Sequence, residues 1–189
     1  TDTSVSYRSW SYIEDDAFRS VTSVVHDLVD IVSKNGNLLL NIGPKADGTI
    51  PQEVQDLLRG LGAWLKLNGE AIYDTRAWVT YGEGPTGNPK AFREEEQDAY
   101  TPEDIRYTQK DATLYATLLG WPGAAATLTS LGSGGPVSAD RIASVTMIGS
   151  PGELAWSQDA GGLTVQLPPE PPCDHATVVR IALTSAQLS

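Results

Sequence analysis

The sequence predicts an α/β segment at the amino end and an all-β segment after it. Two observations indicate this class. Up to Leu65, apolar residues recur at helical spacing on both sides of one short apolar run, which is the pattern helix, strand, helix. Beyond Asp104, short stretches alternate between apolar and polar residues and are separated by Gly and Pro. The first pattern is typical of one unit of an α/β barrel, and the second of an antiparallel β-sandwich.

The first helix is expected between residues 21 and 32. Its apolar residues form a single stripe, and Asn35-Gly36 is a favourable stop after it. Asp15 and Asp16 stand before this helix, where negative charge complements the helix dipole, so we expect them to cap it. The stripe consists of Val21, Val24, Val25, Leu28, Val29 and Val32.

A buried strand is expected at residues 38–42, followed by a polar loop and a second helix. The strand has apolar side chains on both faces, as a parallel sheet or barrel covered by helices requires. Gly43-Pro44 and Asp47-Gly48 form turns, with Asp47 a turn former, and Pro51 occupies a first helical position. The apolar residues of the strand and helix are Leu38, Leu39, Leu40, Ile42, Val54, Leu57, Leu58, Leu61, Trp64 and Leu65.

In barrel enzymes the functional loops follow the carboxyl ends of the strands. Asn41 and the loop 43–49 would therefore lie on the active-site face. The alternative, that the loop is only a Gly/Asp-rich connector, stays open. Glu70 and Arg76 are expected to form an ion pair that closes the last helix onto the second segment, and Glu83 has no evident role.

The second segment is expected to be the β-sandwich. Residues 78–93 are rich in Gly, Pro, Thr and Asn, so we place the change of domain near Tyr81, with one part at 1–80 and the other at 81–189. Alternating segments follow at Ile105 and Tyr107, at Leu114, Ala116 and Leu118, at Val145 and Met147, at Leu163, Val165 and Leu167, and at Val179, Ile181 and Leu183.

The segment 29–44, with 47–51 beyond it, resembles the α-L-fucosidases of glycoside hydrolase family 29. Similar segments follow one another in order at 1–4, 9–12, 62–65, 68–76 and 82–86, and more loosely at 114–116, 119–122 and 154–160. The resemblance implies a catalytic (β/α)8-like barrel followed by a β-sandwich. This chain would carry the last barrel strand and helices plus the C-terminal sandwich.

The same resemblance implies a retaining hydrolase that removes terminal α-linked L-fucose from glycans with an Asp nucleophile and a Glu acid/base. Both residues lie upstream of anything matched here, so we assign no catalytic residue and expect the isolated chain to be inactive. The family's substrate-binding histidines are also upstream, and His26 and His175 match none of them. The alternative is a non-catalytic carbohydrate-binding β-sandwich module, which has no reason to carry a helix–strand–helix unit.

Trp10 is the candidate substrate-binding residue. It stands in the polar loop 7–12, and an indole face in such a place suits the C–H face of a sugar. The resemblance implies that the corresponding Trp-x-Tyr region lies near the fucose pocket, although packing in a core is the alternative. Trp64 lies on a helical stripe and is expected in the core, as are Trp78, Trp121 and Trp156 in the sandwich or its interface.

Composition limits the partners. The formal net charge of −11 argues against nucleic acid and anionic membranes, and no apolar run is long enough to cross a bilayer. Cys173 is the only cysteine, so the chain has no internal disulfide that would indicate its compartment, which stays undetermined. The Cys173 thiol is expected to be inert. No metal or cofactor is expected. The expected partners are a fucosylated glycan and, through the apolar strand 37–42, either a missing N-terminal barrel segment or another copy of the chain.

Overall fold

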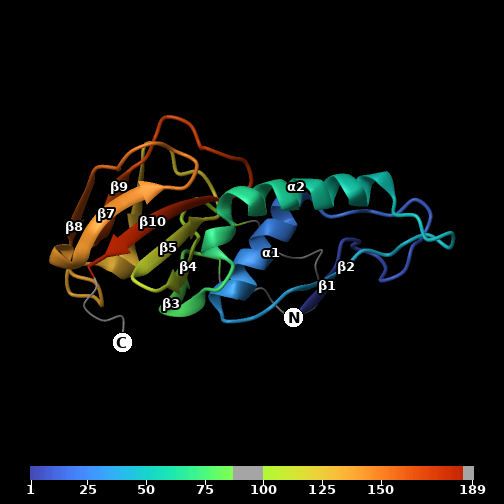
Figure 1. Ribbon diagram of the computed structural model, residues 1–189, viewed down its shortest axis with the longest axis horizontal. Coiled ribbons are helices and arrows are strands. Elements are labelled where there is room, and N and C mark those ends of the chain that lie inside the picture. Colours follow the sequence, from blue (N-terminus) through green and yellow to red (C-terminus); the bar gives the residue numbers. More distant parts are fainter. Residues whose placement is uncertain (87–99, 185–189) are drawn as a thin grey trace.

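The computed structural model describes residues 1–86 and 100–184. The molecule is elongated, with a β-sandwich at one end, two helices in the middle, and a two-stranded sheet with two long loops at the other end (Figure 1). The first half consists of β1 (Asp2–Ser4), α1 (Val21–Ser33), β2 (Leu39–Asn41), α2 (Gln52–Asn68) and the short helix η1 (Gly69–Ala71). None of the helices among the described residues combines the length and the apolar character that a membrane span requires.

Helix α1 begins one residue after Ser20, whose side chain accepts a hydrogen bond from the amide of Ser23 at 3.1 Å. The prediction that Asp15 and Asp16 cap this helix is therefore wrong. Asp15 has a positive φ of 52°, and Asp16 accepts a hydrogen bond from the Ser6 hydroxyl at 2.9 Å. Residues 17–20 separate both acids from the helix, and the Ser20 side chain accepts the hydrogen bond of a helix amide instead.

The predicted end of α1 is confirmed. Asn35 takes a left-handed conformation with φ of 64°, and the amide of Gly36 donates to the carbonyl of Ile31 at 2.9 Å. A Cβ on Gly36 would lie 2.9 Å from Ile31 Cγ2 and 3.0 Å from its carbonyl oxygen, so glycine alone fits there without a shift.

Strands β1 and β2 pair in parallel, and their two faces meet different surroundings. Leu40 and Ile42 pack with Val5 on the core formed by the two helices. Side chains alternate along a strand, so Leu39 points to the opposite face, where it is 71% exposed. The described residues cover only one face of this strand, so its burial on both faces stays a prediction for a complete barrel.

The second half is an antiparallel β-sandwich, as predicted. One sheet has the strand order β3-β4-β5-β10-β7 and the other β6-β9-β8. The predicted alternating segments form β4, β5, β7, β9 and β10, whose apolar side chains fill the space between the sheets. The strands are β3 (Arg76–Glu83), β4 (Ile105–Lys110), β5 (Thr113–Leu118), β6 (Ala125–Leu128), β7 (Ile142–Met147), β8 (Trp156–Asp159), β9 (Gly162–Gln166) and β10 (Thr177–Leu183).

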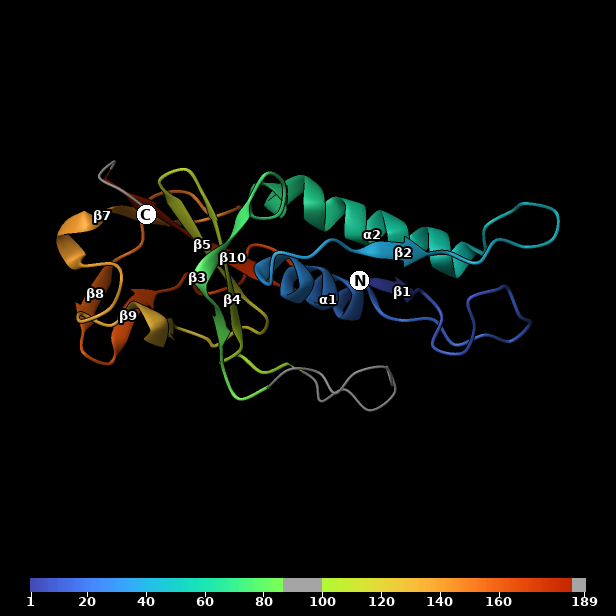
Figure 2. The same cartoon turned by 90° about the horizontal axis from the view of Figure 1, so that it is seen from below.

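The helices rest on one end of the sandwich, as the view from below shows (Figure 2). Trp64 of α2 is 3% exposed, and its indole N–H donates to the carbonyl of Ala176 at 2.8 Å, so its predicted place in the core is confirmed. The Trp78 side chain is buried in the sandwich core, and Trp121 and Trp156 pack against this core.

The predicted ion pair between Glu70 and Arg76 is wrong. Glu70 faces Arg180 of β10 at 3.5 Å, while Arg76 donates to the carbonyl of Thr75. The division of the chain near Tyr81 stays a prediction, because β3 runs across that position. Residues 87–93 of the Gly/Pro-rich segment lie outside the described residues.

Candidate functional site

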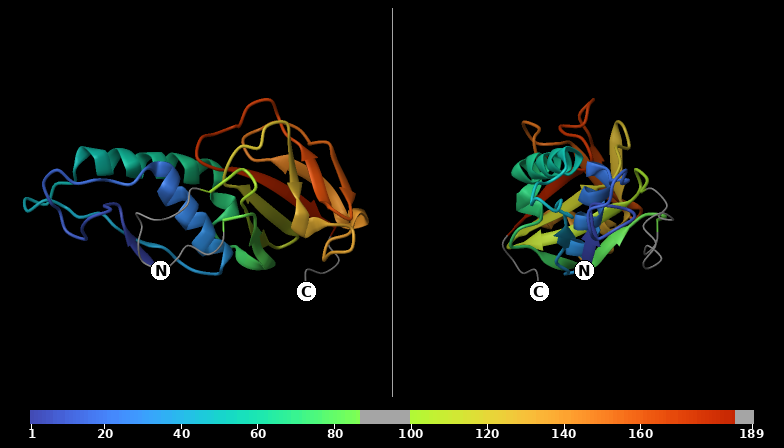
Figure 3. Two further views of the ribbon diagram at one scale, coloured as in Figure 1. Left: turned by 180° about the vertical axis from the view of Figure 1, so that it is seen from behind. Right: turned by 90° about the vertical axis from the view of Figure 1, so that its right-hand side faces the viewer.

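The candidate site lies at the carboxyl ends of β1 and β2. The loops that follow them, residues 5–20 and 42–51, extend together at the end of the molecule away from the sandwich (Figures 1 and 3). Trp10 lies in the first loop and its side chain is 56% exposed. Tyr12 follows it at 37% exposure. The loop thus presents two aromatic side chains to the solvent.

Serine hydroxyls fold the loop that carries Trp10. The Oγ atom of Ser6 accepts hydrogen bonds from the amides of Arg8 at 2.9 Å and Ser9 at 3.0 Å. The Oγ atom of Ser9 accepts one from the amide of Ser11 at 3.0 Å. Short hydroxyl side chains can replace backbone partners in this way, which fixes a loop without regular structure.

Asn41, the last residue of β2, links this loop to the sheet. Its Nδ2 atom donates to the carbonyl of Trp10 at 2.8 Å and to Ser4 Oγ at 3.1 Å. Ser4 in turn donates to the carbonyl of Ser9 at 3.2 Å. The expectation that Asn41 lies on the active-site face stays a prediction, and the structure adds its contacts with the Trp10 loop.

The second loop lies against the first. A Cβ on Gly43, which has φ of 47°, would lie 3.4 Å from the amide nitrogen of Tyr12, and Lys45 Nζ stands 5.5 Å from the centre of the Tyr12 ring. Asp47 accepts from the amide and hydroxyl of Thr49 at 2.9 and 2.7 Å, and these bonds lower its pKa. Its prediction as a turn former is confirmed.

A small hollow lies between these loops. Its volume of about 10 Å³ suits one water molecule. The hollow is lined by Ser4, Val5, Ser6, Ser9, Ser11, Tyr12, Asp16, Phe18, Ile42 and Gly43.

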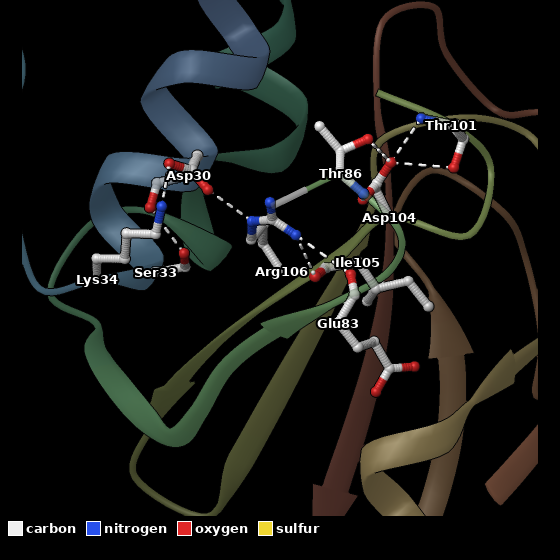
Figure 4. A network of polar contacts seen from close by, with 9 residues as sticks. All are labelled: Asp30, Ser33, Lys34, Glu83, Thr86, Thr101, Asp104, Ile105 and Arg106. Atoms are coloured by element: carbon white, nitrogen blue, oxygen red, sulfur yellow. Dashed lines mark hydrogen bonds and ion pairs between the residues drawn. The ribbon is translucent and has the colours of Figure 1, made fainter. Parts of the chain in front are cut away.

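A second polar cluster lies at the junction of α1 with β4 (Figure 4). Arg106 Nε donates to Asp30 Oδ1 at 2.6 Å, and Lys34 Nζ lies 2.7 Å from Asp30 Oδ2. The Arg106 guanidinium carbon stands 5.7 Å from the Tyr81 ring centre and 5.2 Å from that of Tyr100. Burial alone would lower the pKa of Arg106, but the hydrogen bond and charge of Asp30 raise it.

This cluster is structural rather than catalytic. The Arg106 side chain is only 3% exposed, and Nη1 donates to the carbonyls of Glu83 and Ile105. Burial raises the pKa of Tyr100 to about 12, so this phenol keeps its proton at neutral pH. Arg106 and Lys34 donate to acceptors within the protein, while the Tyr100 hydroxyl is buried without a hydrogen-bond partner among the described residues. The ion pair between Asp30 and Arg106 holds α1 against the sheet.

Glu83 also has a structural role that the sequence did not reveal. Its two carboxylate oxygens accept hydrogen bonds from the amides of Thr129 at 2.7 Å and Ser130 at 2.6 Å. These amides open the short helix η3 (Thr129–Leu131), whose free N–H groups attract negative charge. Glu83 therefore joins β3 to the second sheet.

The two histidines and the cysteine lie between α1, α2 and the loop before β10. His26 Nε2 is 2.9 Å from the carbonyl of His175, whose Nδ1 is 2.8 Å from Thr22 Oγ1, and burial lowers the pKa of His26. Cys173 donates to the carbonyl of Ala176, and burial raises its pKa, as expected of an inert thiol. Within residues 1–86 and 100–184, no group of His, Cys, Asp or Glu side chains is arranged to hold a metal ion.

Two family models match the chain in the order of its two halves. The model of alpha-L-fucosidase matches residues 1–70, and that of the alpha-L-fucosidase C-terminal domain matches residues 97–182. This chain belongs to the α-L-fucosidase family. It is 37% identical to the tissue alpha-L-fucosidase of Mus musculus and 36% identical to that of Homo sapiens, each over 174 residues and 90% of this chain. It spans about a third of the length of these curated relatives, 34% and 33% respectively.

Solved fucosidases share the whole described architecture. The crystal structure of Thermotoga maritima alpha-fucosidase in complex with fucose matches 96% of this chain with a TM-score of 0.76 and 29% identity, and 38% of its own length is covered. The structure of alpha-L-fucosidase isoenzyme 1 from Paenibacillus thiaminolyticus matches 97% of this chain with a TM-score of 0.72 and 30% identity, and 39% of its own length is covered. The predicted architecture, the end of a (β/α)8-like barrel followed by a β-sandwich, is thereby confirmed.

Proposed function

We propose that this chain forms the C-terminal part of a retaining α-L-fucosidase that hydrolyses terminal α-linked L-fucose from glycans. The observation that carries the proposal is the match of both fucosidase models, in order, on a chain that spans a third of its curated relatives. The nucleophilic Asp and the acid/base Glu would come from the part of the barrel that precedes the matched residues. This chain would supply the last barrel units and the sandwich.

We further propose that residues 1–80 belong to the barrel and residues 81–189 to the sandwich domain. A parallel strand pair covered on one face by α1 and α2 supports the barrel assignment, because helices cover the outside of such a barrel. The same pair disfavours the alternative of a carbohydrate-binding module that acts alone. Such a module needs the sandwich but has no use for one barrel unit.

The isolated chain should hydrolyse a chromogenic α-L-fucoside at a negligible rate. Retaining hydrolysis needs two carboxyl groups about 5–5.5 Å apart, one as nucleophile and one as acid/base. In this chain Asp30 is paired, Asp47 closes a turn, and Glu83 caps a helix. Turnover in a preparation free of any longer enzyme, abolished when one of these carboxylates is replaced, would refute the proposal that the catalytic pair lies elsewhere.

We propose that Trp10 lines the fucose subsite of the complete enzyme. Trp10→Ala should lower kcat/KM by about 1–3 kcal/mol in transition-state terms, because an aromatic face against the sugar is lost. The matched control is Tyr73→Ala, which truncates another exposed aromatic residue, 57% exposed, near the sandwich. Unchanged kinetics in Trp10→Ala together with a lowered melting temperature would instead place Trp10 in a packing role.

We propose that the exposed face of β2 is covered in the complete protein by the rest of the barrel, and that isolated chains associate through it. Leu39→Lys should weaken the association seen in sedimentation at micromolar concentration, because it puts a charge on the apolar face. Val79→Lys is the control, since Val79 is 73% exposed on β3, an edge strand of the sandwich. A monomer at every concentration, with the amides of residues 38–42 protected from exchange, would contradict this proposal.

A further inference from the structure

The side chain of Asn41 is placed by the register of the two-stranded sheet. In the parallel pair, Ser4 stands opposite Asn41, and both side chains lie on the face away from the helices. Both residues end their strands, so they lie directly under the loop that continues from β1. The polar end of β2 thus meets the loop that carries Trp10.

The chemistry of the contact fixes which end of the Asn41 amide faces the loop. The carbonyl of Trp10 can only accept a hydrogen bond, so the atom 2.8 Å from it must be the NH2 group. The same nitrogen reaches Ser4 Oγ, and Ser4 donates onward to the carbonyl of Ser9. Two consecutive carbonyls of the loop, those of Ser9 and Trp10, are therefore tied to the strand ends.

We propose that Asn41 is the positioning residue for Trp10: its amide holds the loop backbone so that the indole faces the sugar. This inference rests on the proposed role of Trp10 in the fucose subsite. Asn combines the required length with two N–H donors on one atom. Asp has the same shape but only acceptors, so it would set oxygen against the Trp10 carbonyl oxygen. A positioned binding group acts on the transition state only while its support stays rigid.

Asn41→Asp is the sharpest test, because it replaces one NH2 group by an oxygen. In the complete fucosidase we expect kcat/KM to fall about tenfold, the effect of losing one or two hydrogen bonds that hold the loop. Asn37→Asp is the matched control, since it adds the same charge at an exposed residue before the start of β2 and should leave kcat/KM unchanged. Asn41→Leu removes the donors without adding charge and should show the same loss.

A structural readout separates this role from a general loss of folding. The chain has five tryptophans, so 5-fluorotryptophan labelling gives five fluorine resonances, with Trp10 assigned from Trp10→Phe. In the 189-residue chain, Asn41→Asp and Asn41→Leu should shift the Trp10 resonance and leave the other four in place. An unmoved Trp10 resonance in both variants would overturn the inference.

The double variant Trp10→Ala/Asn41→Asp connects the two measurements. If Asn41 acts through Trp10, the double variant should be no slower than Trp10→Ala alone, whereas additive losses would overturn the inference. Failure of the proposed function has a different signature. In that case Trp10→Ala leaves kcat/KM unchanged while Asn41→Asp still shifts the Trp10 resonance, which supports the positioning of the loop and removes its link to the sugar.

Discussion

Replacement of Asp30 by Ala should destabilise the folded chain by about 3–5 kcal/mol, because it leaves the buried guanidinium of Arg106 without its charged partner. Arg106 is 3% exposed at the side chain and cannot lose its proton to relieve the charge. The hydrogen-bond acceptors that remain are the carbonyls of Glu83 and Ile105, which carry no formal charge. Urea unfolding, followed by far-UV circular dichroism, measures the loss.

Asp56→Ala is the matched control for this substitution. Asp56 pairs with Arg59 on α2 at 2.9 Å, but both side chains are more than 60% exposed, so this pair should contribute less than about 1 kcal/mol. Both variants exchange Asp for Ala within a helix and therefore gain similar helix propensity. Equal stability of the two variants would contradict the assignment of the Asp30–Arg106 pair as a buried support.

Replacement of Arg106, the other partner of the pair, should lower the free energy of unfolding by less. In Arg106→Met, Asp30 keeps the ammonium group of Lys34 at 2.7 Å, so its charge is still compensated. The asymmetry arises because Asp30 has two cationic partners while Arg106 has one carboxylate within hydrogen-bonding distance.

Trp64→Ala should also lower the free energy of unfolding by about 3–5 kcal/mol, since it empties a large volume in the core shared by the helices and the sandwich. It further removes the indole donor from the carbonyl of Ala176. Trp64→Phe should cost less, because it keeps much of the ring volume, and the Cys173 thiol still donates to that carbonyl at 3.3 Å.

Trp10→Ala serves as the control in the same unfolding assay. The Trp10 side chain is 56% exposed, so its truncation leaves no closed cavity and should change stability by less than about 1 kcal/mol. If the two Ala variants lost the same stability, Trp64 could not have the core position that its burial indicates. The pair of variants thus compares the same chemical change in two surroundings.

The regular elements could be predicted from the sequence because their signals are local. The stripes of α1 and α2 follow helical spacing, and Asn35-Gly36 ends α1 as predicted. The alternation of β4 and β10 is likewise contained in a few neighbouring residues. Strand β3 lacked a clear signal, because its pairing with β4 is irregular between Ala77 and Gly82.

Side-chain partners were harder to predict, because they depend on distant parts of the chain. Glu70 was assigned to its near neighbour Arg76, but the folded sheet brings Arg180 beside it. Asp30 and Arg106 are 76 residues apart, and nothing in the sequence near either one indicates the other. Local composition likewise could not show that Ser20, not Asp16, caps α1.

In the candidate site, too, the local feature could be predicted and the contact between distant residues could not. A Trp in a serine-rich loop after the amino-terminal residues indicated exposure, and the structure exposes Trp10. The bond from Asn41 to the Trp10 carbonyl spans 31 residues and exists only when β1 pairs with β2 in the observed register. That register was not visible in the sequence, since β1 has only three residues.

The two faces of β2 also set where the chain length can vary. Leu40 and Ile42 face the helices, while Asn41 faces the Trp10 loop, so one residue inserted between Gly36 and Leu39 would exchange the two sets. The amide would then enter an apolar core and a leucine would replace it under the loop. An insertion at residues 44–49 would only enlarge an exposed turn. Changes of chain length are therefore tolerated after β2, whereas the connection before it must keep its length.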